Sequence, residues 1–118
     1  MSSHMKILCF DLDNVICFTK GNDYDKSKPN KKIISLINNL YKDGYTIKIF
    51  TARYMGKFKG NSKKATKYGY KKTFTQLKKW ELNFHELILG KPSYDLFIDD
   101  KALGFKKNWV KQFKQIIK

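Results

Sequence analysis

Short apolar runs alternate along the chain with longer stretches in which apolar residues recur at helical spacing. Four runs have the length of buried strands, and they lie at 6–10, 45–50, 86–89 and 96–98. Three stretches collect their apolar residues on one side of a helix and predict helices over 31–43, 62–82 and 105–117. Gly44 is a suitable stop for the first helix, and Gly69 is expected to break or kink the second. Residues 14–30 carry turn-forming residues without sustained periodicity, which predicts a loop or small flap.

The order strand, helix, strand, helix, strand, strand, helix predicts an α/β fold. Such alternation favours a Rossmann-like three-layer sandwich, in which a mostly parallel sheet is covered by helices on both faces. The chain has 118 residues, the size of one domain, and leaves no room for an inserted cap domain. We therefore expect one domain over 6–118, preceded at 1–5 by a segment whose sequence resembles a vector-derived tail.

Each predicted strand is followed by polar residues that are costly to bury without a partner. In chain order they are Asp11, Asp13, Thr51, Lys91, Asp99 and Asp100. Ligands of open parallel sheets bind in the crevice beyond the carboxyl ends of the strands. The pattern therefore predicts that these residues converge on one site.

The residue types at this predicted site suit phosphoryl transfer. Two facing pairs of carboxylates repel each other unless a cation lies between them, and Mg²⁺ is the usual hard cation where phosphate is bound. A hydroxyl and a lysine can hold the phosphoryl oxygens, while one carboxylate attacks phosphorus to give an aspartyl phosphate. Asp13, two residues after Asp11, points the same way along an extended backbone and suits the general acid and base.

The ordered motifs resemble those of the haloacid dehalogenase (HAD) superfamily. They are Asp11-Leu12-Asp13-Asn14-Val15, Thr51 after an apolar strand, Gly90-Lys91-Pro92 and Phe97-Ile98-Asp99-Asp100. Each motif alone is weakly specific, but all four in order span nearly the whole chain. Receiver domains of bacterial response regulators also use an Asp pair, a Thr and a Lys. Their phosphoacceptor Asp stands alone after a middle strand, however, and no Asp pair follows their Lys.

The resemblance implies a capless phosphatase domain over 6–118 with a role for each motif residue. Asp11 would be the nucleophile and a Mg²⁺ ligand, and Asp13 the general acid and base, with its backbone carbonyl on the metal. The phosphoryl group would be bound by Thr51, Ala52 and Lys91. Asp99 would bind Mg²⁺ directly, whereas Asp100 would bind it through water or orient the site. Read without the resemblance, Thr51 could be a strand-end cap and Lys91 a surface lysine.

A narrower resemblance links residues 51–61 and 90–100 to small phosphatases of bacterial capsule or surface-polysaccharide synthesis. It implies that the substrate is a small phosphorylated sugar, polyol or amino-alcohol. Arg53 and Lys57 would then be candidate substrate residues. A structural ion pair explains Arg53 equally well, and a solvated loop explains Lys57 nearly as well.

The charge balance leaves a second class of substrate open. Lys plus Arg number 25 against 10 Asp plus Glu, a net charge of +15, and Arg53 is the single arginine. We interpret the lysines mainly as a compositional bias spread over solvated faces, and nucleic acid is not the expected partner. The alternatives are a phosphatase of nucleic-acid ends or phosphoproteins, and a non-catalytic module that binds Mg²⁺ or phosphate.

The remaining sequence features concern the cellular location of the protein and its assembly. Cys9 and Cys17 form no CxxC or metal-ligand spacing, which suits a reduced, cytoplasmic protein, and Cys9 is expected in the core. No apolar run is long enough to cross a membrane, and no secretory leader is recognisable. A homo-oligomer is possible, because a capless site can take specificity from the flap, the loop at 54–61 or a neighbouring subunit.

Overall fold

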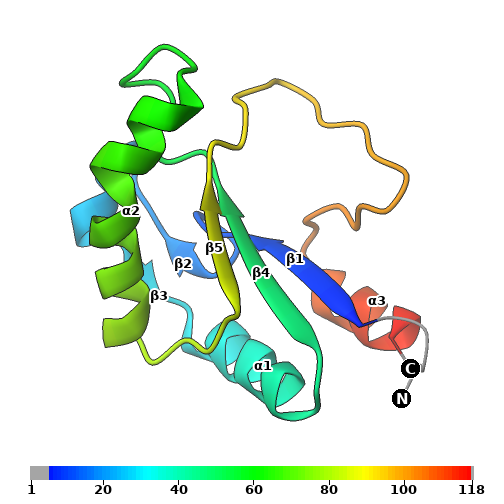
Figure 1. Cartoon of the computed structure of the whole chain (residues 1–118). Coiled ribbons are helices and arrows are strands. Elements are labelled where there is room, and N and C mark those ends of the chain that lie inside the picture. The colour runs from blue at the N-terminus through cyan, green and yellow to red at the C-terminus, as the bar shows by residue number, and fades with distance from the viewer. Residues whose placement is uncertain (1–5, 118) are drawn as a thin grey trace.

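The structure is a computed structural model, and it describes residues 6–117. At its centre is a parallel sheet of three strands in the order β1-β4-β5 (Figure 1). The strands are β1 (Ile7–Asp11), β4 (Thr46–Thr51) and β5 (Glu86–Leu89). The helices are α1 (Lys31–Lys42), α2 (Ser62–Lys79) and α3 (Trp109–Ile116). The segment predicted as a flap contains a small antiparallel hairpin of β2 (Cys17–Phe18) and β3 (Lys28–Pro29), with a 3-10 turn at Tyr24–Lys26.

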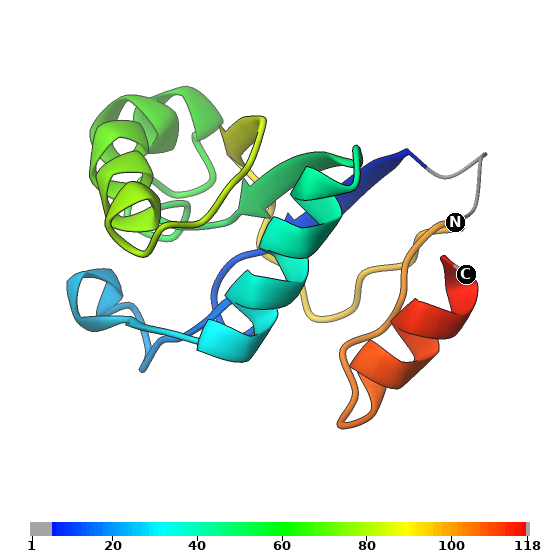
Figure 2. The same ribbon diagram turned by 90° about the horizontal axis from the view of Figure 1, so that it is seen from below.

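The predicted α/β class is confirmed. The parallel sheet with helices packed around it is consistent with a Rossmann-like fold, and the described residues form no cap-like extra domain (Figures 1 and 2). The predicted tail at 1–5 lies outside the described residues. Within 6–117, no helix has the length and apolar character needed to cross a membrane.

The first helix forms as its sequence pattern predicts. The Asn30 side chain caps α1 by accepting a hydrogen bond from the backbone N–H of Ile33 (3.4 Å). Gly44 follows the last turn with a φ of 99°, a conformation that favours glycine over other residues. The apolar side of the helix is buried through Ile33, Ile34, Ile37 and Leu40.

The second helix departs from the prediction because its glycine has a packing role. α2 runs without interruption through Gly69, and the Tyr54 ring lies where a Cβ on this residue would be. The expected break is therefore wrong: the glycine makes room for an aromatic ring from the preceding loop. Thr73, a possible cap by sequence, lies buried in the middle of α2, and the helix ends at Lys79, short of residue 82.

The two faces of the sheet are buried to different degrees. Pairing of β1 with β4 in register puts Phe10 beside Ile49, and both are buried among the helices. The alternate row holds Ile7, Cys9 and Lys48, of which Ile7 is 61% exposed and Cys9 is exposed too. The expectation that Cys9 is a core residue is therefore wrong, because its side of β1 lacks a covering helix.

The fourth predicted strand does not form in this structure. Residues 91–108, which we call the strap, connect β5 to α3 as irregular chain arching away from the sheet (Figure 1). From 92 to 108 every residue is exposed, with Leu96 at 76% and Ile98 at 87%. A run of three apolar residues needs a neighbouring strand to satisfy its backbone, and the described residues provide none for it. The last helix accordingly begins at Trp109, and Phe105 belongs to the strap.

Candidate active site

The carboxyl ends of β1 and β5 bring together the predicted nucleophile and the predicted phosphate-binding lysine. The Lys91 ammonium lies 3.7 Å from Oδ1 of Asp11. That oxygen also accepts a hydrogen bond from the backbone N–H of Leu12 (2.9 Å). The backbone N–H of Lys91 donates to the carbonyl of Thr51 (3.2 Å), which ties the start of the strap to the end of β4. Three predicted site residues therefore meet, as the topology of a parallel sheet requires.

The pKa of the Asp11 carboxyl is subject to two opposing effects. Partial burial raises its pKa above the usual value, because desolvation disfavours the charged form. The positive charge of Lys91 and the hydrogen bond from Leu12 act in the opposite direction and favour the carboxylate. The Asp11 side chain remains 40% exposed and is therefore accessible from solvent.

The end of β4 lies close to Asp11 and Lys91, but the side chain of its last residue, Thr51, is not at the surface. The Thr51 side chain is fully buried, and its hydroxyl accepts a hydrogen bond from the backbone N–H of Arg53 (3.2 Å). Ala52 is partly exposed. In this conformation the buried Thr51 hydroxyl stabilises the turn, whereas Ala52 lies at the surface beside the candidate site.

Asp13 forms a partly buried ion pair with Arg53. The guanidinium Nε donates to both carboxylate oxygens (3.2 and 3.0 Å), and Nη2 donates to Oδ1 (2.9 Å). The Arg53 side chain is 1% exposed, and its Nη1 donates to Oε1 of Gln76 on α2 (2.7 Å). Of the two interpretations of Arg53, the structure shows the structural ion pair.

The same network extends into the flap and includes residues that the sequence did not single out. The Thr19 hydroxyl donates to Oδ1 of Asp13 (2.6 Å), and it shares a second hydrogen bond with the Ser27 hydroxyl (2.6 Å). The Tyr24 ring lies 4.9 Å from the Arg53 guanidinium carbon, and the Tyr24 carbonyl accepts from the Gln76 amide. Asp13 is therefore held by the flap and by Arg53, and α2 in turn holds Arg53 through Gln76.

The second aspartate pair lies apart from this site in a single chain. Asp99 and Asp100 are exposed in the strap, where Oδ1 of Asp99 accepts a hydrogen bond from the backbone N–H of Lys101 (3.1 Å). This local turn holds the pKa of Asp99 below its usual value. Within residues 6–117, no three His, Cys, Asp or Glu side chains are placed to bind one metal ion. The predicted ligand set is therefore not assembled within one chain.

Lys57 is exposed in the loop before α2. Its ammonium lies over the rings of Phe58 (5.8 Å) and Tyr68 (5.1 Å). Its predicted contact with substrate stays a prediction.

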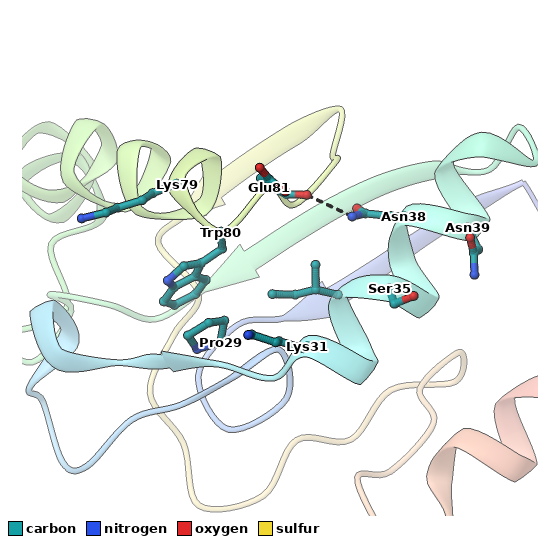
Figure 3. A pocket seen from close by; sticks show the side chains of 9 residues that line it. Pro29, Lys31, Ser35, Asn38, Asn39, Lys79, Trp80 and Glu81 are labelled. Atoms are coloured by element: carbon teal, nitrogen blue, oxygen red, sulfur yellow. Dashed lines mark hydrogen bonds between the residues drawn. The ribbon is translucent and has the colours of Figure 1, made fainter.

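Two hollows adjoin α2 on the side of the flap. One, of about 420 Å³, lies between α1 and the end of α2, where the Asn38 amide donates to the Glu81 carbonyl (2.9 Å; Figure 3). The other, of about 560 Å³, reaches Arg53 and Gln76, and both hollows are lined by Trp80. Neither is lined by Asp11 or Lys91.

The chain is thus an α/β protein that presents a carboxylate and a lysine at the carboxyl ends of parallel strands. It is similar to a structural-genomics target from Vibrio cholerae, with a TM-score of 0.77 and 27% identity over 97% of this chain and 100% of that one. It also shares its fold with a chain of the Pnkp1/Rnl/Hen1 complex, with a TM-score of 0.55 and 16% identity over 98% of this chain and 35% of that one. No protein-family model and no curated protein matches the sequence.

Proposed function

We propose that the protein is a phosphoric monoester hydrolase that forms an aspartyl phosphate on Asp11. The observation that carries this proposal is the approach of Lys91 to Asp11, 3.7 Å apart, where β1 and β5 end beside the turn at 51–53. The HAD-like order of the motifs supports the same chemistry. On the narrower resemblance, the substrate is a small phosphorylated sugar, polyol or amino-alcohol used in the cytoplasm for capsular polysaccharide synthesis.

In the proposed reaction the Asp11 carboxylate attacks phosphorus, and the bond from phosphorus to the ester oxygen breaks. Asp13 gives a proton to the departing alkoxide, then removes one from the water that hydrolyses the aspartyl phosphate. Lys91 offsets the negative charge of the phosphoryl group. The hydrogen bonds from Arg53 hold the Asp13 carboxyl group in one orientation for both proton transfers.

Mg²⁺ is implied by the resemblance, but the residues gathered in one chain do not fit it. Mg²⁺ prefers a near-octahedral set of oxygen ligands. The site contains two carboxylates, and that of Asp13 is already bound by Arg53 and Thr19. The proposed steps therefore use the protein's own groups alone.

A phosphate-release screen tests the proposed function. The panel contains sugar, polyol, amino-alcohol and nucleotide monophosphates, each with Mg²⁺, with wild-type protein and Asp11→Asn side by side. We expect release from at least one small ester by the wild type and none by the variant. A wild type that binds phosphate but releases none from any ester would instead identify a non-catalytic binding module.

The distribution of lysines supports a second candidate, a phosphatase acting on a polyanion such as a nucleic-acid end. Residues 57–79 contain nine lysines and no acidic residue, so much of the net charge lies on α2 and the loop before it. Like charges at i and i+4, such as Lys63 and Lys67, repel each other on a helix, and a bound polyanion relieves this repulsion.

Salt dependence distinguishes the two candidates, and charge-matched variants remove the effect of net charge alone. One variant replaces three α2 lysines by glutamine, namely Lys64, Lys67 and Lys71. The other replaces three lysines from the C-terminal part of the chain, namely Lys106, Lys107 and Lys111. A polyanion substrate predicts that KM rises steeply with salt and that only the α2 variant weakens this slope. Equal salt dependence of KM in both variants would exclude a polyanion bound along α2 and leave the small phosphate ester as the proposed substrate.

A further inference from the structure

The larger of the two hollows lies between the flap and α2, and its lining combines charge, fixed hydrogen-bonding groups and aromatic rings. Its volume of about 560 Å³ falls in the range of about 300–1,000 Å³ that is typical of pockets for small ligands. The proposed reaction uses one of the lining residues, Arg53, and leaves the chemistry of the others unassigned.

Arg53 and Gln76 bring hydrogen-bonding groups to this hollow that are held in place before any ligand binds. Nη1 of Arg53 donates to Oε1 of Gln76 (2.7 Å), and Nε2 of Gln76 donates to the Tyr24 carbonyl (2.8 Å). Each of these two nitrogens carries a second N–H, and residues 6–117 provide no further hydrogen-bond acceptor for it. A ligand that accepts these hydrogen bonds loses little affinity to side-chain entropy, because both groups are already ordered.

Two lysines of α2 make the hollow attractive to an anion. Lys72 and Lys79 line it and are exposed, and Asp25 is the one acidic residue in the lining. The charge of Arg53 is balanced by Asp13, so the two lysines leave the hollow with an excess of positive charge. They lie seven residues apart on one side of the helix, about 10 Å along its axis. Two ammonium groups at this spacing suit two linked phosphates better than a single one.

The aromatic part of the lining provides a surface for a planar ring. Trp80, directly after α2, is half-buried and lines both hollows (Figure 3). Tyr54 also lines the larger hollow, but its ring packs against Gly69 and pairs with the rings of Tyr24 and Tyr68. Among the described residues no aromatic ring pairs with Trp80. Because every nucleobase has a π-face, any base can stack on such a ring.

We propose that the hollow between the flap and α2 binds a nucleoside diphosphate. The base stacks on Trp80, and the two phosphates lie beside Lys72 and Lys79. The ribose oxygens accept hydrogen bonds from Arg53 and Gln76. Inorganic phosphate would leave the aromatic ring and the fixed donors unused, and a neutral ring would leave the lysines unused. A nucleoside diphosphate uses all three parts of the lining, and its binding does not depend on the proposed phosphatase activity.

The first experiment is a calorimetric titration of the Asp11→Asn variant, in which turnover cannot interfere. The probes are uridine diphosphate, adenosine diphosphate, inorganic diphosphate and uridine. We expect both nucleotides to bind about tenfold more tightly than inorganic diphosphate or uridine, because stacking adds to the attraction of the phosphates. Nucleotides that do not bind, or that bind no more tightly than inorganic diphosphate, would overturn the proposal. Either result leaves the proposed phosphatase activity untouched, since the titration measures binding alone.

Charge-matched variants then locate the bound nucleotide. One carries Lys72→Gln and Lys79→Gln in the hollow, and its control carries Lys64→Gln and Lys67→Gln on α2 outside it. We expect the first pair to weaken binding of uridine diphosphate about tenfold and the control pair to change it less than about twofold. Trp80→Leu should weaken binding of the nucleotide and leave that of inorganic diphosphate unchanged. Equal losses in the two lysine pairs would overturn the proposal, and this comparison decides even if Trp80→Leu does not fold.

Discussion

Asp11 is a residue at which catalysis and stability have opposite requirements. Because its pKa is raised in the folded protein, folding favours the protonated carboxyl. Its contribution to stability is therefore present at low pH and is lost as the pH rises through the raised pKa, and above it the carboxylate opposes folding. The chemistry needs this same carboxylate as the nucleophile.

Replacing Asp11 by asparagine should therefore abolish turnover without lowering thermal stability. Asparagine keeps the shape of the side chain and removes the partly buried charge at pH 7. Thermal unfolding at pH 7 checks this, with the exposed Asp95→Asn as a control for charge removal. A clear drop in melting temperature for Asp11→Asn, absent from Asp95→Asn, would contradict this explanation.

Arg53 should matter to stability far more than the nearby Lys57. Truncation to alanine leaves the mostly buried Asp13 carboxylate without its main partner, a loss of about 3 kcal/mol in the free energy of unfolding. Lys57→Ala, at an exposed site, should change it by less than ~0.5 kcal/mol. Urea unfolding measures both, and equal losses would show that the ion pair does not hold the flap.

At the scale of elements, the packing of Tyr54 on α2 predicts an unusual result for a glycine in a helix. Alanine is the better helix former by about 1 kcal/mol, so Gly69→Ala should stabilise α2 if propensity alone decided. The added Cβ meets the Tyr54 ring, and we expect a net loss of roughly 1–3 kcal/mol instead. Gly56→Ala, where a Cβ has open space, is the matched control, and a stabilised Gly69→Ala would disprove the contact.

The elements that the sequence predicts well are those whose signal is local. α1 carries its own cap at Asn30, its apolar side and its glycine stop, and β5 has the bounds predicted for it. The run at 96–98 has an equally apolar pattern but is no strand, because a strand also depends on a neighbour. The uninterrupted path of α2 through Gly69 likewise depends on a ring from another segment.

At the scale of the whole molecule, part of the site was predictable and part was not. Asp11 and Lys91 could be placed together because the carboxyl ends of parallel strands share one edge of a sheet. The network around Asp13 and Arg53 could not, because Thr19, Ser27 and Gln76 come from segments without a shared motif.

The central claim is that phosphorus is transferred to Asp11, and a single-turnover experiment tests it directly. Protein in excess of a cleavable phosphate ester is quenched in acid within the first turnover, and the peptide containing residues 7–13 is weighed by mass spectrometry. We predict one added phosphoryl group on Asp11 in the wild type and none in Asp11→Asn. Phosphate release by the wild type with no label on Asp11, or with the same label in the variant, would contradict the claim.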